Sequence, residues 1–263
     1  MGQVYIIPDR QDVERSVSLA GEYGAAFEYN DFWKPDVLDD REKQEQIIEH
    51  YAKYRTDFSR DTMHGAFLDI CVHSDDALIR KISRDRVIQS LEIAKRMGLK
   101  GVVFHTGLIG SLRTAGYLKG WKEKNIRFFT EIAERFPNQN IYMENMFDKT
   151  PDMLAELAEA LRDVQNFGVC LDYAHGAITD CPCETWVRTL APFIRHMHIN
   201  DNDLHDDLHR SIGNGSIDWN VFNNLILQYE IDSSVLVEVN GYEAQKTSLE
   251  YLKRNHIFLM NEA

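Results

Sequence analysis

Short apolar segments that end in histidines or acidic residues recur along the chain, and this repetition limits its fold more than any other feature. Of eight such segments, the clearest end at His105, Glu144, Asp172, His198 and Glu238. They lie roughly 30 residues apart and are separated by helix-like segments, as in a repeated strand–helix unit. The series predicts a (β/α)8 barrel with its active site at the carboxyl ends of the strands.

The length of the chain agrees with one barrel, since 263 residues is close to the roughly 250 that are typical. No Pro/Gly/Ser-rich stretch offers a linker, so a single domain over residues 1–263 is expected. The apolar runs are too short to span a bilayer, and the start of the chain lacks the basic region and cleavage site of a signal peptide. A soluble, cytoplasmic protein is therefore expected.

The expected strands follow the apolar segments, and helix-like segments separate them. The strands should cover residues 4–8, 25–30, 64–70, 101–105, 141–144, 168–172, 194–199 and 235–239. A doubly wound open sheet is the alternative fold, but no G-x-G-x-x-G or P-loop motif follows any of these segments. Strands and helices that alternate in this way favour a closed parallel sheet.

Several helix boundaries can also be placed. Gly24 and Gly98 suit the left-handed position after a helix, and Ser83 suits the position before one. The remaining signals are a polar helix that ends near Tyr54, a helix opened by Thr150-Pro151-Asp152, and an amphipathic helix that starts at Asp218-Trp219.

The charge of the chain disfavours one class of partner, and its cysteine content indicates the state of the thiols. Forty-two acidic residues against 29 basic ones give a formal net charge of −13, which disfavours nucleic acid as a partner. The four cysteines are Cys71, Cys170, Cys181 and Cys183. They are too few and too irregularly spaced for a disulfide framework, and the closely spaced last two lack a second pair at zinc-site spacing. Reduced thiols are expected.

The chemistry is concentrated at the ends of the last four strands. Glu144, Asp172, His198 and Glu238 end four successive predicted strands, so their side chains should converge at one side of the barrel mouth. Carboxylates with imidazole and without thiolate suit Mn²⁺, Co²⁺, Mg²⁺, Fe²⁺ or Zn²⁺. The sequence therefore predicts a divalent metal site.

The chain resembles the xylose-isomerase-like TIM barrels, which include sugar (phosphate) isomerases and epimerases as well as endonuclease IV. The resemblance covers essentially the whole chain, and its most specific segments are HTG (105–107), Asp172-x-x-His175, HMHIND (196–201) and HRSIGNGSIDW (209–219). It implies that Glu144, Asp172, His198 and Glu238 form the metal set of the isomerases and epimerases. It also implies further ligands of the kind with which endonuclease IV holds three zinc ions: His64, His105, His175, Asp207 and His209.

The loops at the mouth favour a sugar enzyme over a nuclease. The segments NDFWKPDVLDD and CVHSDD, after the second and third predicted strands, are both net acidic. A duplex-binding enzyme needs the opposite sign at its phosphate contacts. We therefore expect an isomerase or epimerase with a small carbohydrate substrate, an endonuclease IV-like phosphodiesterase as the alternative, and a non-catalytic barrel that binds sugar or metal as a third possibility. The sequence leaves the oligomeric state open.

The expected reaction is proton transfer next to a carbonyl, with the metal stabilising the enediolate. The resemblance gives Glu144 and Glu238 acid and base roles, and Arg210 a substrate-binding role. A surface arginine paired with Asp206 or Asp207 is the alternative for Arg210. His175 could orient the substrate instead of binding metal.

Three other residues near the expected mouth can be interpreted in more than one way. Trp33 could form a wall of the substrate pocket or pack against a helix. His196 precedes His198 by two residues and should be a hydrogen-bonded histidine one layer deeper in the barrel. Glu28 could reach the substrate or form hydrogen bonds within the barrel wall.

Overall fold

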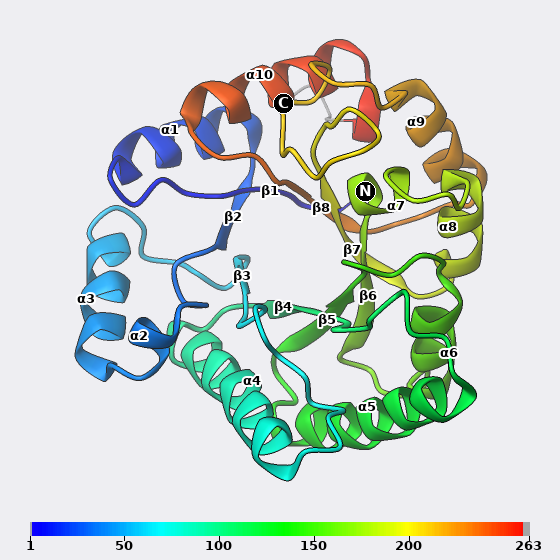
Figure 1. Cartoon of the computed structure of the whole chain (residues 1–263). Helices are drawn as coiled ribbons and strands as arrows, with labels where there is room; N and C mark the ends of the chain where they lie inside the picture. The colour runs from blue at the N-terminus through cyan, green and yellow to red at the C-terminus, as the bar shows by residue number, and fades with distance from the viewer. Residues whose placement is uncertain (1, 260–263) are drawn as a thin grey trace.

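The computed structural model describes residues 2–259, which form a closed parallel barrel with its strands in chain order (Figure 1). The strands are β1 (Val4–Ile6), β2 (Ala26–Tyr29), β3 (Thr62–His64), β4 (Gly101–His105), β5 (Asn140–Glu144), β6 (Phe167–Asp172), β7 (Ile194–Ile199) and β8 (Ser234–Val237). β8 pairs with β1, with Leu236 opposite Tyr5, and this pairing closes the sheet. The predicted (β/α)8 fold is confirmed.

Helices surround the barrel on its outer face (Figure 1). They are α1 (Val13–Tyr23), α2 (Pro35–Leu38), α3 (Arg41–Ala52), α4 (Ala77–Met97), α5 (Ala115–Arg135), α6 (Asp152–Ala160), α7 (Tyr173–Ala177), α8 (Cys183–Leu190), α9 (Trp219–Gln228), α10 (Tyr242–Arg254) and the short η1 (Ile257–Leu259). No helix within residues 2–259 combines the length and apolarity that crossing a membrane requires.

Successive side chains of a strand point to opposite faces of the sheet. The strands therefore separate an outer core, between the sheet and the helices, from the interior of the barrel. One large apolar cluster lies between strands and helices and includes Phe27, Met143 and Met197. The apolar clusters on the other face are small, and one of them consists of Val103, Tyr142 and Cys170. Much of the barrel interior is therefore polar, which is where the chemistry described below lies.

Two predicted boundaries around the third strand are wrong. β3 ends at His64 and does not begin there, because the chain turns away after it and Asp69 adopts a left-handed φ of 60°. α4 begins at Ala77, where Asp76 accepts hydrogen bonds from two free backbone N–H groups, and not after Ser83. Ser83 lies buried inside the helix, where its hydroxyl accepts a hydrogen bond from the backbone N–H of Cys71.

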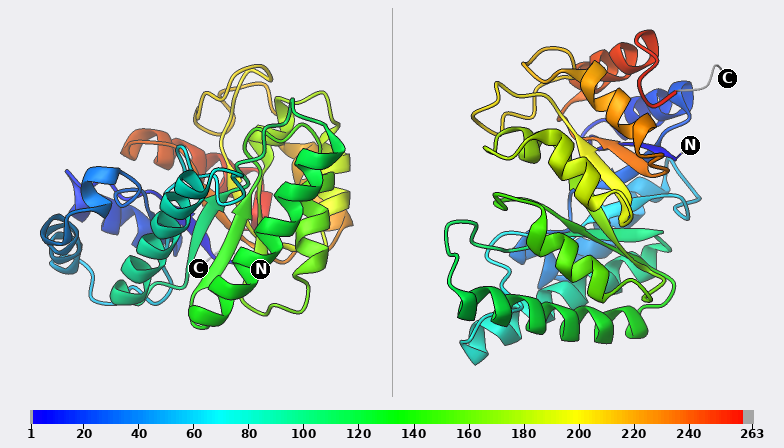
Figure 2. Two further views of the ribbon diagram at one scale, coloured as in Figure 1. Left: turned by 60° about the horizontal axis from the view of Figure 1, so that its bottom comes forward. Right: turned by 90° about the vertical axis from the view of Figure 1, so that its right-hand side faces the viewer.

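Three other helix boundaries were predicted well, and one at α6 was not. Gly24 and Gly98 follow α1 and α4 with φ of 63° and 72°, and Asp218 caps α9 with its side chain. α6 starts at Asp152, so Pro151 precedes the helix and does not form its first turn. The loop between β7 and α9, yellow in Figure 2, projects from one end of the barrel.

Candidate metal centre

Four buried ligand side chains converge at the carboxyl ends of β5 to β8. Glu144 and Asp172 are the last residues of β5 and β6, His198 is near the end of β7, and Glu238 directly follows β8. One ligand atom from each lies within 4.8 Å of the others. The sequence predicted this convergence, which arises because parallel strands end at the same rim and each places an inward side chain there.

The distances in this group suit a shared cation. His198 Nδ1 lies 3.3 Å from one oxygen of Glu144 and 3.4 Å from one of Glu238. Ligands about 2.1 Å from a tetrahedral ion are separated by about 3.4 Å. Both Glu144 oxygens, His198 Nδ1 and one oxygen each of Asp172 and Glu238 are buried without a hydrogen bond from any described residue. Buried charges without partners are costly, so this donor set fits a divalent cation.

A second group shares Glu144 with the first. His64 ends β3 and His105 ends β4, and the Nε2 atoms of these histidines lie 3.2 Å apart. Each of them is 3.3 Å from the Glu144 oxygen that faces away from His198. Three ligand atoms at these separations could hold a second ion, to which Glu144 would offer its other oxygen.

A third group lies nearer to solvent. His175, on α7, and His209, in the loop after β7, place their Nε2 atoms 3.3 and 3.2 Å from one oxygen of Asp207. The Nδ1 atoms of these histidines contact backbone carbonyls, of Asn145 at 2.9 Å and of Glu238 at 2.9 Å. Such contacts fix the tautomer that leaves Nε2 free for a metal.

The electrostatics of the three groups reflect burial and close opposite charges. Burial raises the pKa of Asp172 to about 7, and the carboxylates of Glu238 and Glu144 add to the shift. Burial would also raise the pKa of Glu144, but His198 and His105 outweigh it and hold that pKa well below its usual range. Burial opposes protonation of His209, yet the hydrogen bond to Asp207 and the charge of Glu238 raise its pKa to about 10. Burial lowers the pKa of His105. Apart from Asp172 and His105, these histidines and carboxylates hold each other charged, in places where a metal ion would substitute for the protons.

Asn145 supports the centre and was not singled out by the sequence. Its side-chain amide spans both backbone groups of Asp172, accepting from the N–H and donating to the carbonyl, each at 2.9 Å. Asp172 in turn accepts a hydrogen bond from the backbone N–H of His175 at 2.6 Å. The only sequence signal for Asn145 is its place directly after Glu144.

Asp201 holds the loop that carries Asp207 and His209, and its role was also missed. Its carboxylate is fully buried and accepts hydrogen bonds from the backbone N–H groups of Gly213 and Ile217 and from the indole of Trp219. The acidic residue stands in the predicted HMHIND motif, but its partners come from a segment further along the chain. Its function becomes visible only when the loop is folded.

The predicted substrate-binding residues lie around this centre but differ in distance from it. Arg210 forms backbone hydrogen bonds in both directions with Asp201, and its side chain is exposed. No ion pair to Arg210 occurs within residues 2–259. The Trp33 ring lies 4.7 Å from that of Phe67, which itself lies 4.8 Å from the His64 ring and 5.1 Å from the His105 ring. Phe67, which the sequence did not single out, therefore separates Trp33 from the ligand histidines.

The residues one layer deeper behave as barrel-wall residues. His196 is fully buried, with its Nδ1 2.7 Å from the Ser234 hydroxyl and its Nε2 3.0 Å from a Glu28 oxygen. The prediction of a hydrogen-bonded interior histidine is confirmed. Glu28 is buried as well, among partners that are themselves buried, so it lies in the wall and not at the mouth.

Comparisons with known proteins agree with this architecture. A family described as xylose isomerase-like TIM barrel matches residues 17–255. Probable endonuclease 4 of Nitratidesulfovibrio vulgaris is 25% identical over 268 aligned positions, which cover 90% of this chain and 91% of that protein. Two solved structures share the fold. The TTHB071 protein of Thermus thermophilus, soaked with ZnCl2, has a TM-score of 0.75, 20% identity and coverage of 96% and 98% of the two chains. A D-tagatose 3-epimerase-like protein has a TM-score of 0.73, 21% identity and 98% coverage of each.

Proposed function

Because the chain belongs to the xylose isomerase-like TIM barrel family, we propose that it is a divalent-metal-dependent enzyme of one domain that isomerises or epimerises a small carbohydrate or carbohydrate phosphate. The observation that carries the proposal is the buried group Glu144, Asp172, His198 and Glu238, in which two glutamates face one histidine nitrogen. Similarity to an epimerase-like fold supports the choice of substrate class.

The positions of the two glutamates support a role in proton transfer at a sugar carbon. Their carboxylates extend from β5 and from the end of β8, and both lie close to His198 Nδ1. His198 and other positive neighbours hold the pKa of each glutamate below its usual range despite burial. Both are therefore ionised, and one can remove a proton from a substrate carbon while the other mediates its return. A divalent ion held by the four residues would polarise the carbonyl and stabilise the enediolate charge.

The surroundings provide groups that can orient a polar substrate. Burial opposes protonation of His175, but Asp172 and Asp207 raise its pKa well above the usual range, so the ring carries a positive charge that can attract substrate oxygens. Arg210 lies on the loop next to His209 and is exposed to approaching ligands. Phe67 presents an apolar ring beside His64 and His105, and a sugar ring face can pack on such a surface.

Solvent isotope exchange tests this proposal. Protein reconstituted with Mn²⁺, Co²⁺ or Zn²⁺ is incubated in deuterated water with a panel of ketoses and ketose phosphates. We expect deuterium at the carbon beside the carbonyl, since removal and return of that proton are common to isomerisation and epimerisation. Chelated protein should exchange nothing, and restored metal should recover the reaction. Absence of exchange across the panel by metal-replete protein would reject the proposal.

A second function is favoured by the two additional ligand groups. His64 with His105 and His175 with Asp207 and His209 extend the centre to three potential ion positions, and clustered ions suit phosphodiester hydrolysis by stabilising attacking and leaving oxygens. Similarity to a probable endonuclease supports this alternative.

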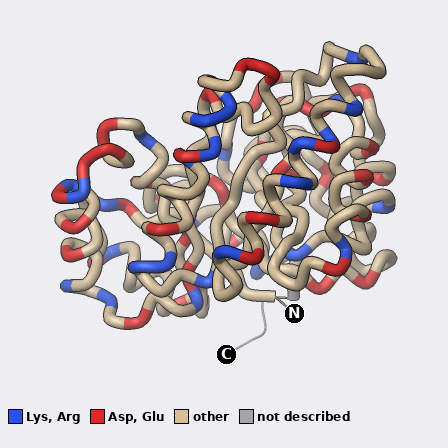
Figure 3. The backbone as a smooth tube through the Cα atoms, turned by 90° about the horizontal axis from the view of Figure 1, so that it is seen from below, with Lys and Arg blue, Asp and Glu red and all other residues tan. Residues whose placement is uncertain are grey.

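The charge of the molecule argues against a duplex substrate. The loops after β2 and β3 carry more acidic than basic residues, and Lys and Arg are interspersed with Asp and Glu along the outer helices (Figure 3). Incision of abasic duplex DNA at nanomolar protein, without any ketose exchange, would establish the hydrolytic function instead. We expect DNA binding no tighter than about 10⁻⁴ M at physiological salt.

A further inference from the structure

Glu28, on β2, connects two histidines inside the barrel below the candidate metal centre. One of its oxygens lies 2.9 Å from His198 Nε2, and the other lies 3.0 Å from His196 Nε2 and accepts a hydrogen bond from the Thr62 hydroxyl at 2.7 Å. Only 1% of Glu28 is exposed, so water cannot take the place of these partners. The contacts of this carboxylate are thus made inside the barrel.

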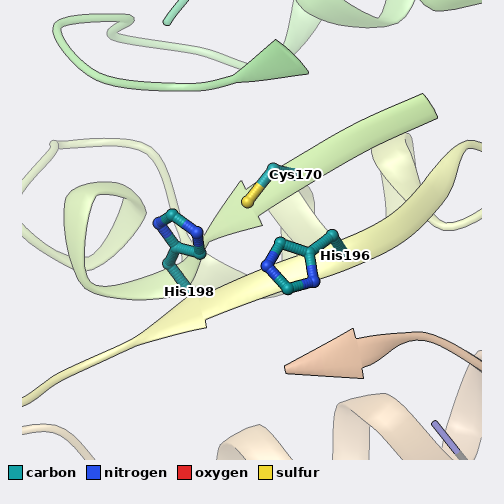
Figure 4. Close-up of side chains that lie close together, drawn as sticks. All are labelled: Cys170, His196 and His198. Carbon is teal, nitrogen blue, oxygen red and sulfur yellow. The ribbon is translucent and has the colours of Figure 1, made fainter. Parts of the chain in front are cut away.

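The layer around Glu28 does not have the character of another metal site. Figure 4 shows Cys170 of β6 beside His196 and His198 of β7, and these three could in principle bind an ion. Both ring nitrogens of His196 are already engaged, however, by Ser234 and Glu28. A metal site in this layer would therefore require a ring nitrogen that already has a hydrogen-bond partner.

We propose that Glu28 is a positioning residue that orients His198 for the cation. His198 Nε2 faces Glu28, and Nδ1 faces Glu144 and Glu238 on the opposite side of the ring. The Glu28 charge, 2.9 Å from Nε2, favours the proton on that nitrogen and leaves the Nδ1 lone pair directed at the ion position. A carboxylate behind a ligand histidine fixes its tautomer and raises its basicity. This inference rests on the proposed metal-dependent function.

The contacts around Glu28 explain how its buried negative charge is stabilised inside the barrel. A buried charge is destabilising unless its partners are close and well oriented, and here two imidazoles and a hydroxyl surround it. His196 is hydrogen-bonded to Ser234 of β8 and to Glu28. Glu28 also accepts a hydrogen bond from Thr62 and lies in contact with His198. The chain of contacts runs from β8 through β7 and β2 back to β7. The orientation of one metal ligand is therefore determined by strands on different sides of the barrel.

Metal titration of a matched pair of variants tests the role of Glu28. Glu28→Gln keeps the shape but removes the charge and one of two acceptors, and we expect the affinity for the metal alone, Co²⁺ or Zn²⁺, to fall roughly 10- to 100-fold. Tyr142→Phe is the control. The Tyr142 ring stacks on His196 with 5.2 Å between ring centroids, but the hydroxyl that the substitution removes bonds to Asn140. The metal affinity of this variant should match that of the unchanged protein.

Two further readouts separate positioning from general damage. Nitrogen-15 shifts of His198 in the zinc-loaded protein should report Nε2 protonated and Nδ1 bound in the unchanged protein, and a mixture in Glu28→Gln. Circular dichroism of both metal-free variants should show a folded barrel. If Glu28→Gln does not fold, Glu28→Asp replaces it, with a smaller loss of affinity expected.

The outcomes distinguish this inference from the proposed function. An unchanged protein that binds no ion rejects the metal-dependent function itself. In a second outcome, the unchanged protein binds an ion, and folded Glu28→Gln, or Glu28→Asp in its place, binds it with an affinity within about threefold of the unchanged protein. This outcome rejects only the positioning role. A loss confined to the Glu28 variants, with Tyr142→Phe unaffected, supports the role.

Discussion

The two oxygens of Glu144 face different ligand groups, so this residue should be the most sensitive position in the centre. One oxygen lies near His198 and the other near His64 and His105. Glu144→Gln removes charge from both groups, and we expect turnover to fall at least about 10²-fold with reduced metal content. Glu238→Gln should lower turnover similarly but leave the group of His64 and His105 unchanged.

Steady-state kinetics and elemental analysis of the two variants provide the measurement. Glu156→Gln is the control, since Glu156 pairs with Lys122 on the outer surface and its loss should leave turnover unchanged. Near-normal turnover by either site variant on the true substrate would show that its assignment is wrong.

Metal binding at the solvent-facing group should release protons. Its imidazoles are protonated beside Asp207, and the pKa of His209 is raised to about 10, so at pH 7.5 without metal this ring carries its proton. A metal needs the lone pair, so each ion bound here must displace at least one proton. Affinity should therefore rise with pH, by roughly tenfold per pH unit for each proton released.

Calorimetry in buffers with different ionisation enthalpies counts those protons directly. A His209→Gln variant, which has no proton to release at that position, should release about one fewer. An affinity that stays constant between pH 6 and pH 8 would contradict the predicted competition.

At the scale of elements, the loop between β7 and α9 depends on one glycine. A Cβ on Gly215 would lie 2.2 Å from the carboxylate of Asp201 and 2.3 Å from the carbonyl oxygen of Asn202, far inside contact distance. Gly215→Ala must displace the carboxylate that anchors this loop. We expect the variant to lose metal at the group that contains His209 while the strands stay folded.

Gly116→Ala on α5 is the matched control, because a Cβ there meets nothing within 4 Å. Elemental analysis should show one ion fewer only in Gly215→Ala. Circular dichroism should show that both variants are folded. Equal metal content in both variants would mean that the loop tolerates the displacement.

The accuracy of the sequence-based boundaries depended on how local their cause is. Gly98 and Asp218 were placed correctly because each acts on the backbone of its own helix end. The start of α4 was missed because its first turns expose Leu78 and Ile79, so no apolar face begins there. Ser83 resembles a cap in sequence, but its hydroxyl is used by the distant Cys71 N–H.

The candidate site shows the same limit. Strand-end ligands such as Asp172 and His198 could be predicted because strand position alone determines their convergence. The roles of Asn145 and Asp201 could not, since their partners lie on other elements. For Glu28 the sequence indicated the barrel wall as one of two positions, but not its contact with His198. Tertiary contacts of this kind leave no local signature in one sequence.

At the scale of the whole molecule, metal should stabilise the fold measurably. The ligands come from β3 through β8 and their loops, and unfolding would scatter them. A ligand that binds only the folded state stabilises it by about 2.7 kcal/mol at 100 times its dissociation constant, which corresponds to roughly 5–10 °C in Tm for a chain of this size. Thermal melts with and without chelator, with Glu144→Gln as the insensitive control, measure this shift.

An equal Tm with and without saturating metal would show that the three ligand groups of the folded protein do not bind the ion. The same experiment in graded salt separates specific binding from general screening of the charge of −13.

Closure of the barrel has a consequence for the order of events during synthesis. β8 pairs with β1, and Glu238 directly follows β8, so the last of the four deepest ligands leaves the ribosome only with the strand that seals the sheet. A chain that ends before β8 has Glu144, Asp172 and His198 but lacks Glu238. A cation held by all four side chains would therefore require β8 to be in place, because the strand that closes the sheet also positions Glu238.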